Sequence, residues 1–250
     1  IRDPEQSYSA GDFVRDALAL MEEIFSRGHI PLLVGGTMMY FRALTEGIAE
    51  LPAADDAIRA AIDAQAAREG WPAMHAELAT VDATAAARIN PNDSQRIQRA
   101  LEVYRASGKT LTDWQQRNAR PTAGISYLKI ALKIEPRKRL HQRIEARLGK
   151  MVAEGFVEEI ERLRSRPELT RDCPAMRAVG YRQFWKYLDG ECSLDEAQAR
   201  ALFATRQLAK RQLTWLRSEA DVCTVDTLEA GAIDTISEHL AGNLGEIVER

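Results

Sequence analysis

The sequence predicts an α/β protein whose parallel sheet core is interrupted by a helical insertion. Near the start, a helix-like pattern leads into the short apolar run 30–34, and Gly35-Gly36 then opens a second helical pattern. A helix, a short apolar strand and another helix are typical of a parallel sheet covered on both faces. The range 51–116 holds helical segments without a strand candidate, and strand-like alternation resumes at 127. We therefore expect a core of residues 1–46 and 122–250 and an insertion at 47–121.

The first helix and the turn after the apolar run carry local signals. Ser9 to Asp12 has the form of a capping box, and apolar residues then recur at helical spacing from 13 to 25. Gly35 and Gly36 allow a tight turn and leave amide groups at a helix start, where the dipole favours an anion. Thr37 adds a hydroxyl to this anion site. The alternative is that Gly-Gly only joins a strand to a helix.

The insertion is expected to consist of five helical segments, at 55–68, 73–78, 83–89, 95–107 and 111–116. Gly70, the turn at 90–93 and Gly108 separate them, and Ser94 is available as the cap of the fourth.

The core resumes with a strand at 127–134, which Pro136 closes, and a long amphipathic helix at 137–154. On that helix Arg139, Arg143 and Arg147 are four residues apart, so they stack on one face. Like charges at this spacing favour an anionic partner, although a solvated basic face is the alternative. Further helices broken at Pro167 and Pro174, a long helix at 193–217 and a short strand at 222–225 complete the chain.

The composition excludes several classes of protein. With 250 residues, 45% hydrophobic and 28% charged, the chain can bury a core and is not disordered. The net charge is −3, yet basic residues crowd 137–150 and 200–217, so a local nucleic-acid surface is compatible with it. The three cysteines are far apart without a Cys-x-x-Cys pair, which disfavours disulfides and zinc and favours a reducing cytoplasm. No apolar run approaches the roughly 20 residues that span a bilayer.

Four segments, taken together, resemble one family. They are Gly35–Tyr40, Asn92–Arg99, Val179–Gln183 and Thr205–Arg217. In this order they are similar to bacterial tRNA dimethylallyltransferases, the tRNA isopentenyltransferase or IPP transferase family, over almost the whole chain. Met39 stands where family members often carry Leu, which conserves volume.

The resemblance implies a P-loop NTPase-like core and the transfer of a dimethylallyl group from dimethylallyl diphosphate to N6 of the tRNA adenosine next to the anticodon. That chemistry requires anion stabilisers, usually with Mg²⁺, and a base near the amine. The adenine must also leave its stack, so the enzyme has to grip the anticodon stem-loop around it. We expect a cytoplasmic monomer without membrane attachment.

The resemblance also implies site residues. Thr37 is the catalytic candidate, and no residue is assigned as a metal ligand. Gly35, Gly36, Arg143 and Arg147 are assigned to the diphosphate, the two arginines on helix spacing more than on a motif. The residues implied in tRNA binding are Arg59, Gln95, Arg96, Gln98, Arg99, Arg177, Gly180, Tyr181, Arg182, Lys210, Arg211, Gln212, Trp215 and Arg217.

One family feature is missing from the sequence. Members begin with a P-loop, Gly-x-x-x-x-Gly-Lys-Thr, followed by an Asp that resembles a general base, and residues 1–250 contain no such start. The sequence begins at Ile1 without Met, so we expect a missing N-terminal segment and no prenyl transfer by residues 1–250 alone.

Two other functions remain open from the residues. A nucleotide kinase or other phosphoryl-transfer enzyme uses the same fold and phosphate site, but the Gln- and Arg-rich insertion and the long 205–217 motif disfavour it. A non-catalytic RNA-binding module is the second alternative, and a P-loop encoded upstream of Ile1 would exclude it.

Overall fold

The computed structural model describes residues 1–47, 49, 51–118 and 124–248. The chain divides into two compact units, one made of residues 1–40 and 126–250 and the other of residues 41–125. The second unit includes the range expected for the insertion and extends a few residues beyond it at each end. Helix α2 (Met38–Glu46) contains the division at residue 40.

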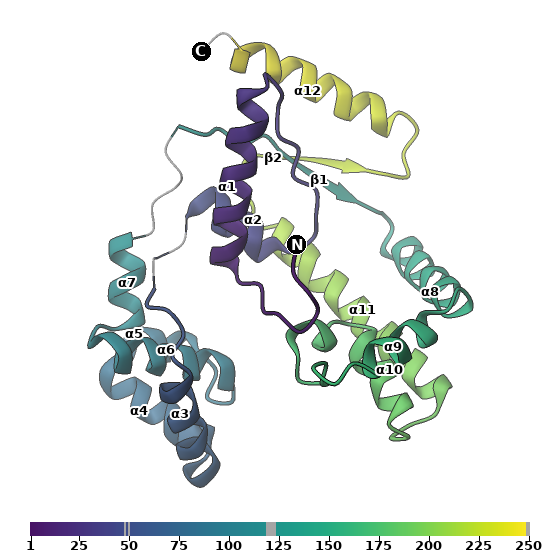
Figure 1. The fold of residues 1–250 in the computed structure, drawn as a ribbon. Coiled ribbons are helices and arrows are strands. Elements are labelled where there is room, and N and C mark those ends of the chain that lie inside the picture. Colours follow the sequence, from purple (N-terminus) through teal and green to yellow (C-terminus); the bar gives the residue numbers. More distant parts are fainter. Residues whose placement is uncertain (48, 50, 119–123, 249–250) are drawn as a thin grey trace. The chain divides into compact units, whose positions relative to one another are not determined.

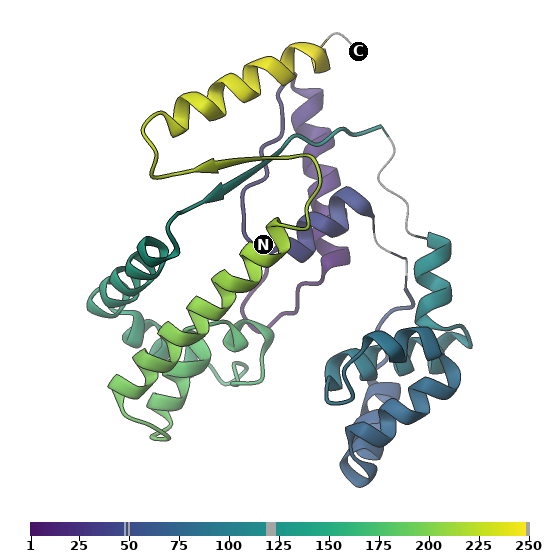
Figure 2. The ribbon, with the colours of Figure 1, turned by 180° about the vertical axis from the view of Figure 1, so that it is seen from behind.

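The first unit contains a parallel pair of strands. Strands β1 (Lys129–Lys133) and β2 (Val222–Asp226) lie side by side in register from Lys129 opposite Val222 to Lys133 opposite Asp226 (Figures 1 and 2). The ladder continues one residue further, because Thr227 N donates to the Lys133 carbonyl at 3.0 Å. Asp226, almost buried, accepts a hydrogen bond from Glu135 N at 3.0 Å and so holds the chain where it leaves β1.

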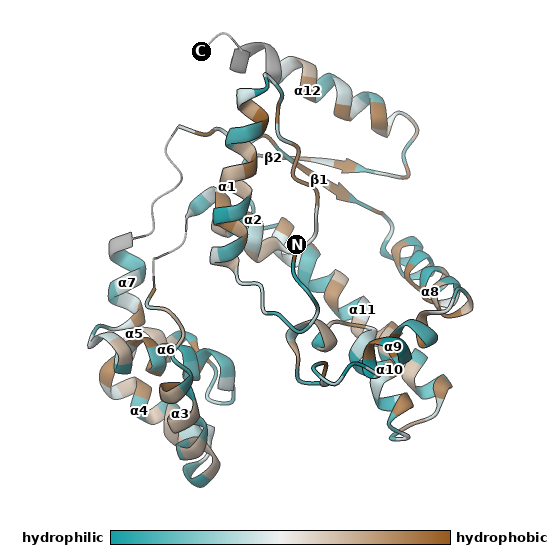
Figure 3. Ribbon diagram, in the orientation of Figure 1, coloured by the Kyte–Doolittle hydropathy of each residue, from teal (hydrophilic) through white to brown (hydrophobic). Residues whose placement is uncertain are grey.

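The expected strand at 30–34 is not a strand in the described part of the chain. Its apolar side chains face solvent, with exposed fractions of 53% for Ile30, 83% for Leu32 and 85% for Val34, and Figure 3 shows how hydrophobic the segment between α1 and α2 is. A strand exists only through the ladder that it forms with a neighbour. Among the described residues β1 and β2 pair with each other, and 30–34 has no ladder partner.

Helices build the hydrophobic core of the first unit. Helix α1 (Ala10–Ser26) begins with the expected capping box of Ser9 and Asp12. The bounds of the others are α8 Arg137–Ala153, α9 Phe156–Arg164, η1 Pro174–Arg177, α10 Tyr181–Leu188, α11 Leu194–Leu216 and α12 Ala232–Val248. Phe156 and Phe184 meet edge to face at 5.3 Å in a cluster that also contains Ile160, Trp185 and Ala197. This cluster joins α9, α10 and α11.

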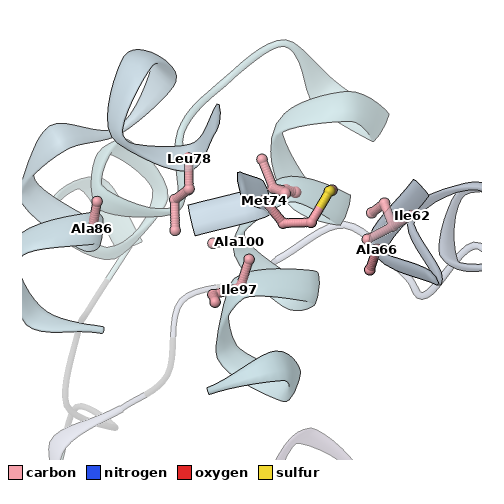
Figure 4. Packing of buried hydrophobic residues seen from close by; sticks show 8 residues of the cluster. Ile62, Ala66, Met74, Leu78, Ala86, Ile97 and Ala100 are labelled. Atoms are coloured by element: carbon pink, nitrogen blue, oxygen red, sulfur yellow. The ribbon is translucent and has the colours of Figure 1, made fainter. Parts of the chain in front are cut away.

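The second unit has a core of its own. Its helices are α3 Asp56–Glu69, α4 Trp71–Val81, α5 Ala83–Arg88, α6 Ser94–Ser107 and α7 Leu111–Asn118. Figure 4 shows Met74 and Leu78 of α4 between side chains of α3, α5 and α6. The five expected helices are therefore present, but the cap of α6 is Asp93 rather than Ser94. The Asp93 carboxylate accepts from Arg96 N at 3.2 Å, so the helix starts one residue earlier than expected.

Candidate active site and nucleic-acid interface

The Gly35-Gly36 turn lies directly before α2 and in contact with α11. Gln212 of α11 donates from Nε2 to the Gly36 carbonyl at 2.8 Å. A Cβ on Gly36 would lie 2.6 Å from that nitrogen. Gly36 is therefore required for close approach of the amide, and not for a positive φ, which it does not adopt.

Tyr40 holds the other end of the motif. Its ring stacks on Phe13 at 4.8 Å between centroids, and its hydroxyl donates to the Tyr8 carbonyl at 2.8 Å. The main chain closes the first turn of α2, because Tyr40 N donates to the Thr37 carbonyl at 2.9 Å. The Tyr of the motif is thus a structural anchor.

Thr37 stands exposed between these two anchors. Its hydroxyl makes no hydrogen bond to any residue that the structure describes. A capping or core threonine would use its hydroxyl on the protein, as Thr112 does with Asp82 at 2.7 Å. The Thr37 hydroxyl is thus available to a ligand.

A groove of about 210 Å³ lies between α8 and α11. Its apolar lining comes from Leu140, Phe203, Ala209 and Leu213, and its polar lining from Arg137, His141, Arg206, Gln207 and Lys210. Arg206 is oriented by Glu145, which accepts from its Nη2 at 3.1 Å. The lining combines three cationic side chains, Arg137, Arg206 and Lys210, with apolar ones, which suits an anion that carries apolar or aromatic groups.

Arg143 and Arg147 do not line this groove. Both are exposed on α8, whereas Arg137 and His141, four residues apart, belong to the lining between α8 and α11. The helical spacing predicted the face of Arg143 and Arg147 as the anion site and did not predict the face of Arg137 and His141. The available signal was Leu140, which the helical period places beside Arg137 and His141.

The residues of α11 that were expected at tRNA divide into two groups. Lys210, Arg211 and Arg217 are exposed cations, and Arg217 follows the end of the helix. Gln212 is engaged with Gly36, and Trp215 is half-buried.

The segment 177–182 also contains both exposed cations and residues that contact the rest of the protein. Arg177 and Arg182 are exposed. Gly180 is buried with φ at +99°, and a Cβ there would lie 3.1 Å from the Phe156 ring. The Tyr181 hydroxyl donates to Glu159, and burial together with that carboxylate raises the pKa of Tyr181 to about 12. Gly180 and Tyr181 therefore shape the segment that presents the two arginines.

In the second unit, the start of α6 is an open surface. An open depression of about 420 Å³ is lined by Asn90, Asn92, Asp93, Ser94 and Gln95. Gln95 and Arg96 are exposed at its edge, whereas Gln98 donates to Asp63 at 2.7 Å. Polar amides and a cation at an exposed helix start are suited to phosphate and base edges.

Glu102 of α6 is buried between Arg59 and Arg99, two residues expected at tRNA, and the sequence did not predict its role. Its side chain is 1% exposed and accepts from Asp55 N, Arg59 Nε and Arg99 Nη1 at 2.9, 2.9 and 2.8 Å. Burial opposes ionisation, but the hydrogen bonds from Arg99, the Asp55 amide and Arg59 outweigh it and lower the pKa of Glu102. Arg99 also donates to the Pro52 carbonyl at 2.8 Å. Arg59 keeps its two Nη groups without a partner in the described residues.

Comparison with known proteins decides the family. A family model described as IPP transferase matches residues 1–219. The chain belongs to the IPP transferase family. The chain is 53% identical over 235 residues to a Bordetella pertussis protein named tRNA dimethylallyltransferase, and the alignment covers 93% of this chain and 75% of that one. A protein of the same name from Paraburkholderia phymatum is 54% identical over 229 residues, or 90% of this chain and 72% of that one.

Solved structures are similar to this chain along its whole length. The full-length tRNA isopentenylpyrophosphate transferase of Bacillus halodurans matches with a TM-score of 0.67 and 35% identity, over 100% of this chain and 78% of that one. A eukaryotic dimethylallyltransferase acting on tRNA matches with a TM-score of 0.75 at 23% identity, over 100% of this chain and 65% of that one, which shows the fold alone. The expected fold class, an α/β fold with a P-loop NTPase-like parallel sheet core and a helical insertion, is confirmed.

The described residues of the chain do not form a magnesium site by themselves. Mg²⁺ prefers carboxylate oxygens and phosphates, and no group of three or more His, Cys, Asp or Glu side chains that could hold a metal occurs in the described ranges. Nor does any helix there have the length and apolar character needed to cross a membrane.

Proposed function

We propose that the protein transfers the dimethylallyl group of dimethylallyl diphosphate to N6 of the adenosine next to the anticodon in tRNA. The observation that carries the proposal is the family match over residues 1–219. It is supported by a free threonine hydroxyl on a glycine turn and by basic and amide-bearing surfaces on both units.

The reaction balances as an alkyl substitution. The bond between the allylic carbon and the diphosphate oxygen breaks, a bond from N6 of adenine to that carbon forms, and N6 loses a proton. Diphosphate leaves with the electron pair. Its charge has to be stabilised where it develops, which is the role proposed for the main chain at Gly35 and Gly36 and for Arg143 and Arg147.

Thr37 is proposed to orient the adenine. Its hydroxyl both donates and accepts hydrogen bonds, so it can contact the exocyclic amine or the ring nitrogen beside it. No residue of this chain is assigned as the base that removes the proton.

Different residues are proposed to hold the anticodon stem-loop. The exposed cations Arg96, Arg177, Arg182, Lys210, Arg211 and Arg217, with Arg59 and Gln95, supply phosphate and base contacts. Arginine suits this substrate because it binds phosphate bidentately and stacks on unpaired bases. Gln98, Arg99, Gly180, Tyr181 and Gln212 have protein partners, so we assign them to the architecture of these surfaces.

Mg²⁺ is proposed only as a counter-ion of the diphosphate. The described side chains offer no ligand set for it, so no step is derived through the ion. The protein is proposed to act in the cytoplasm.

The proposal is tested with the protein as its gene encodes it. Incubation with labelled dimethylallyl diphosphate and unmodified tRNA, followed by nucleoside analysis, should give N6-dimethylallyladenosine at one position. Phosphate transfer from ATP to a nucleotide without prenylation would instead support the kinase alternative. Tight tRNA binding without either reaction would support a non-catalytic RNA-binding module.

A further inference from the structure

The long helix α11 is fastened to the turn that carries Thr37 by one amide side chain. Gln212 Nε2 lies 2.8 Å from the Gly36 carbonyl oxygen, although the two residues are 176 positions apart. Both belong to the unit made of residues 1–40 and 126–250. Among the described residues, the apolar segment 30–34 before the turn pairs with no strand, so this hydrogen bond fixes a part of the chain that no described ladder holds.

The absence of a side chain at Gly36 leaves room for the Gln212 amide. An alanine Cβ would come within 2.6 Å of the Gln212 amide nitrogen, closer than side chains approach one another in proteins. The backbone at Gly36 needs no glycine for its own conformation, because its φ is not positive. A Cβ at position 36 would displace the end of the Gln212 side chain, so glycine at this position permits the contact.

The turn is thus held from two directions. Gln212 fixes the carbonyl immediately before Thr37, and Tyr40, packed on Phe13 and bonded to the Tyr8 carbonyl, fixes the first turn of α2 after it. Thr37, between them, has no side-chain partner of its own in the described structure. Its position depends on these two anchors.

We propose that Gln212 is a positioning residue for prenyl transfer, which sets the Gly36-Thr37 turn, and that it is not a tRNA contact. This inference rests on the proposed function. It assigns α11 two tasks, because Lys210 and Arg211 are exposed cations while the next side chain holds the catalytic turn. A contact that orders Thr37 should affect the chemical step and leave tRNA affinity almost unchanged.

The first test compares Gln212→Ala with Gln198→Ala in the protein as its gene encodes it. Gln198 is also on α11, near its start, and its side chain forms no hydrogen bond with the residues that the structure describes. Single-turnover prenyl transfer should slow on the order of threefold to tenfold for Gln212→Ala, the range of one neutral hydrogen bond. The tRNA dissociation constant should stay within about twofold, and Gln198→Ala should match the wild type in both measurements. Lost tRNA affinity with an unchanged transfer rate would overturn the proposal, as would no change in either.

The second test uses the steric match at Gly36. Gly36→Ala alone should slow transfer, because its Cβ displaces the Gln212 amide. In the Gln212→Ala background the same substitution should have a smaller effect, since the obstructing atom is gone. Equal effects of Gly36→Ala in both backgrounds would show that the contact does not set the turn.

Thermal melts of the wild type, Gln212→Ala, Gly36→Ala and the double variant distinguish a failure of the proposed function from a failure of the proposed contact. The coupling between positions 36 and 212 should also appear in the melting temperatures, whether or not the protein transfers a prenyl group. Absence of transfer by the wild type would contradict the proposed function alone. Additive melting temperatures would contradict the contact itself, and with it this inference.

Discussion

Glu102 shows how one buried carboxylate organises a surface that is otherwise polar and exposed. It binds Arg59 and Arg99, two of the residues expected at tRNA, together with the main chain at Asp55. Glu102→Gln keeps the size but removes the charge, and it replaces an acceptor by a donor that faces other donors. We expect the free energy of unfolding to fall by about 1–3 kcal/mol, since both arginines stay partly solvated. Urea unfolding measures the loss.

A surface pair provides the control for Glu102. Glu77 contacts Arg105 at 2.7 Å, with side chains 34% and 27% exposed. Glu77→Gln should cost less than about 1 kcal/mol, as expected for ion pairs near solvent. Equal losses for the two variants would mean that Glu102 is not the centre of the network.

The stability that Glu102 contributes should depend on pH. Its pKa is lower in the folded protein than the ordinary value of 4.5. A group with a lowered folded pKa contributes stability above its unfolded pKa and loses it as the pH falls through the folded value. The stability difference between wild type and Glu102→Gln should therefore be constant from pH 7 to about 5 and shrink below about 4.5. Urea unfolding of both proteins over this pH series measures it, and a difference that grows toward acid pH would contradict the assignment.

Thr37 should matter to the reaction rather than to the fold. Its exposed hydroxyl has no partner in the described structure, so Thr37→Ala should leave the melting temperature nearly unchanged. The prenyl transfer rate should fall by about 10-fold or more if the hydroxyl orders the adenine. Thr112→Ala is the contrast. The Thr112 hydroxyl and main-chain amide both donate to Asp82, and loss of the hydroxyl should lower the melting temperature. A collapse of stability in Thr37→Ala would make Thr37 a structural turn residue.

Helices were predicted well where a cap and a periodic apolar face agree. The capping box at Ser9 and the apolar faces of α1, α8 and α11 marked helices that the structure has within a few residues. Helix α12 was missed, since Gly242 and Gly245 lower helix propensity in its C-terminal half. The segment 30–34 was wrongly predicted as a strand, because composition indicates β preference but not a partner.

The site was predicted in its segments and not in its contacts. The turn at 35–37 and the exposed arginines follow from motifs and from helical spacing. The bond from Gln212 to Gly36, and the convergence of Arg59 and Arg99 on Glu102, depend on how distant elements pack. A local sequence pattern does not reveal such packing. Residues with structural roles, such as Arg99 and Gln212, were therefore predicted as tRNA contacts together with residues that face solvent.

The cations of α11 and α8 are predicted to serve different ligands. Lys210→Ala should weaken tRNA binding and reduce the slope of log affinity against log salt by about 0.7–0.9, because one phosphate contact is lost. Arg143→Ala should raise the KM for dimethylallyl diphosphate and leave that slope unchanged. Filter binding over a salt series and steady-state kinetics on both variants measure these effects. An unchanged slope for Lys210→Ala would remove α11 from the tRNA surface.

The two units have separate hydrophobic cores, which predicts that a cavity in one core will not weaken the other. Met74 is fully buried among α3, α5 and α6, all within residues 41–125, whereas Phe184 is fully buried among α9, α10 and α11. Met74→Ala should lower the stability of the second unit by about 2–5 kcal/mol, through lost transfer energy and a residual cavity. Native-state hydrogen exchange should become faster in α3, α4 and α6 and stay unchanged in α9 and α10. Phe184→Leu should produce the converse pattern, and equal loss of protection in both units from either variant would mean that the chain unfolds as one cooperative unit.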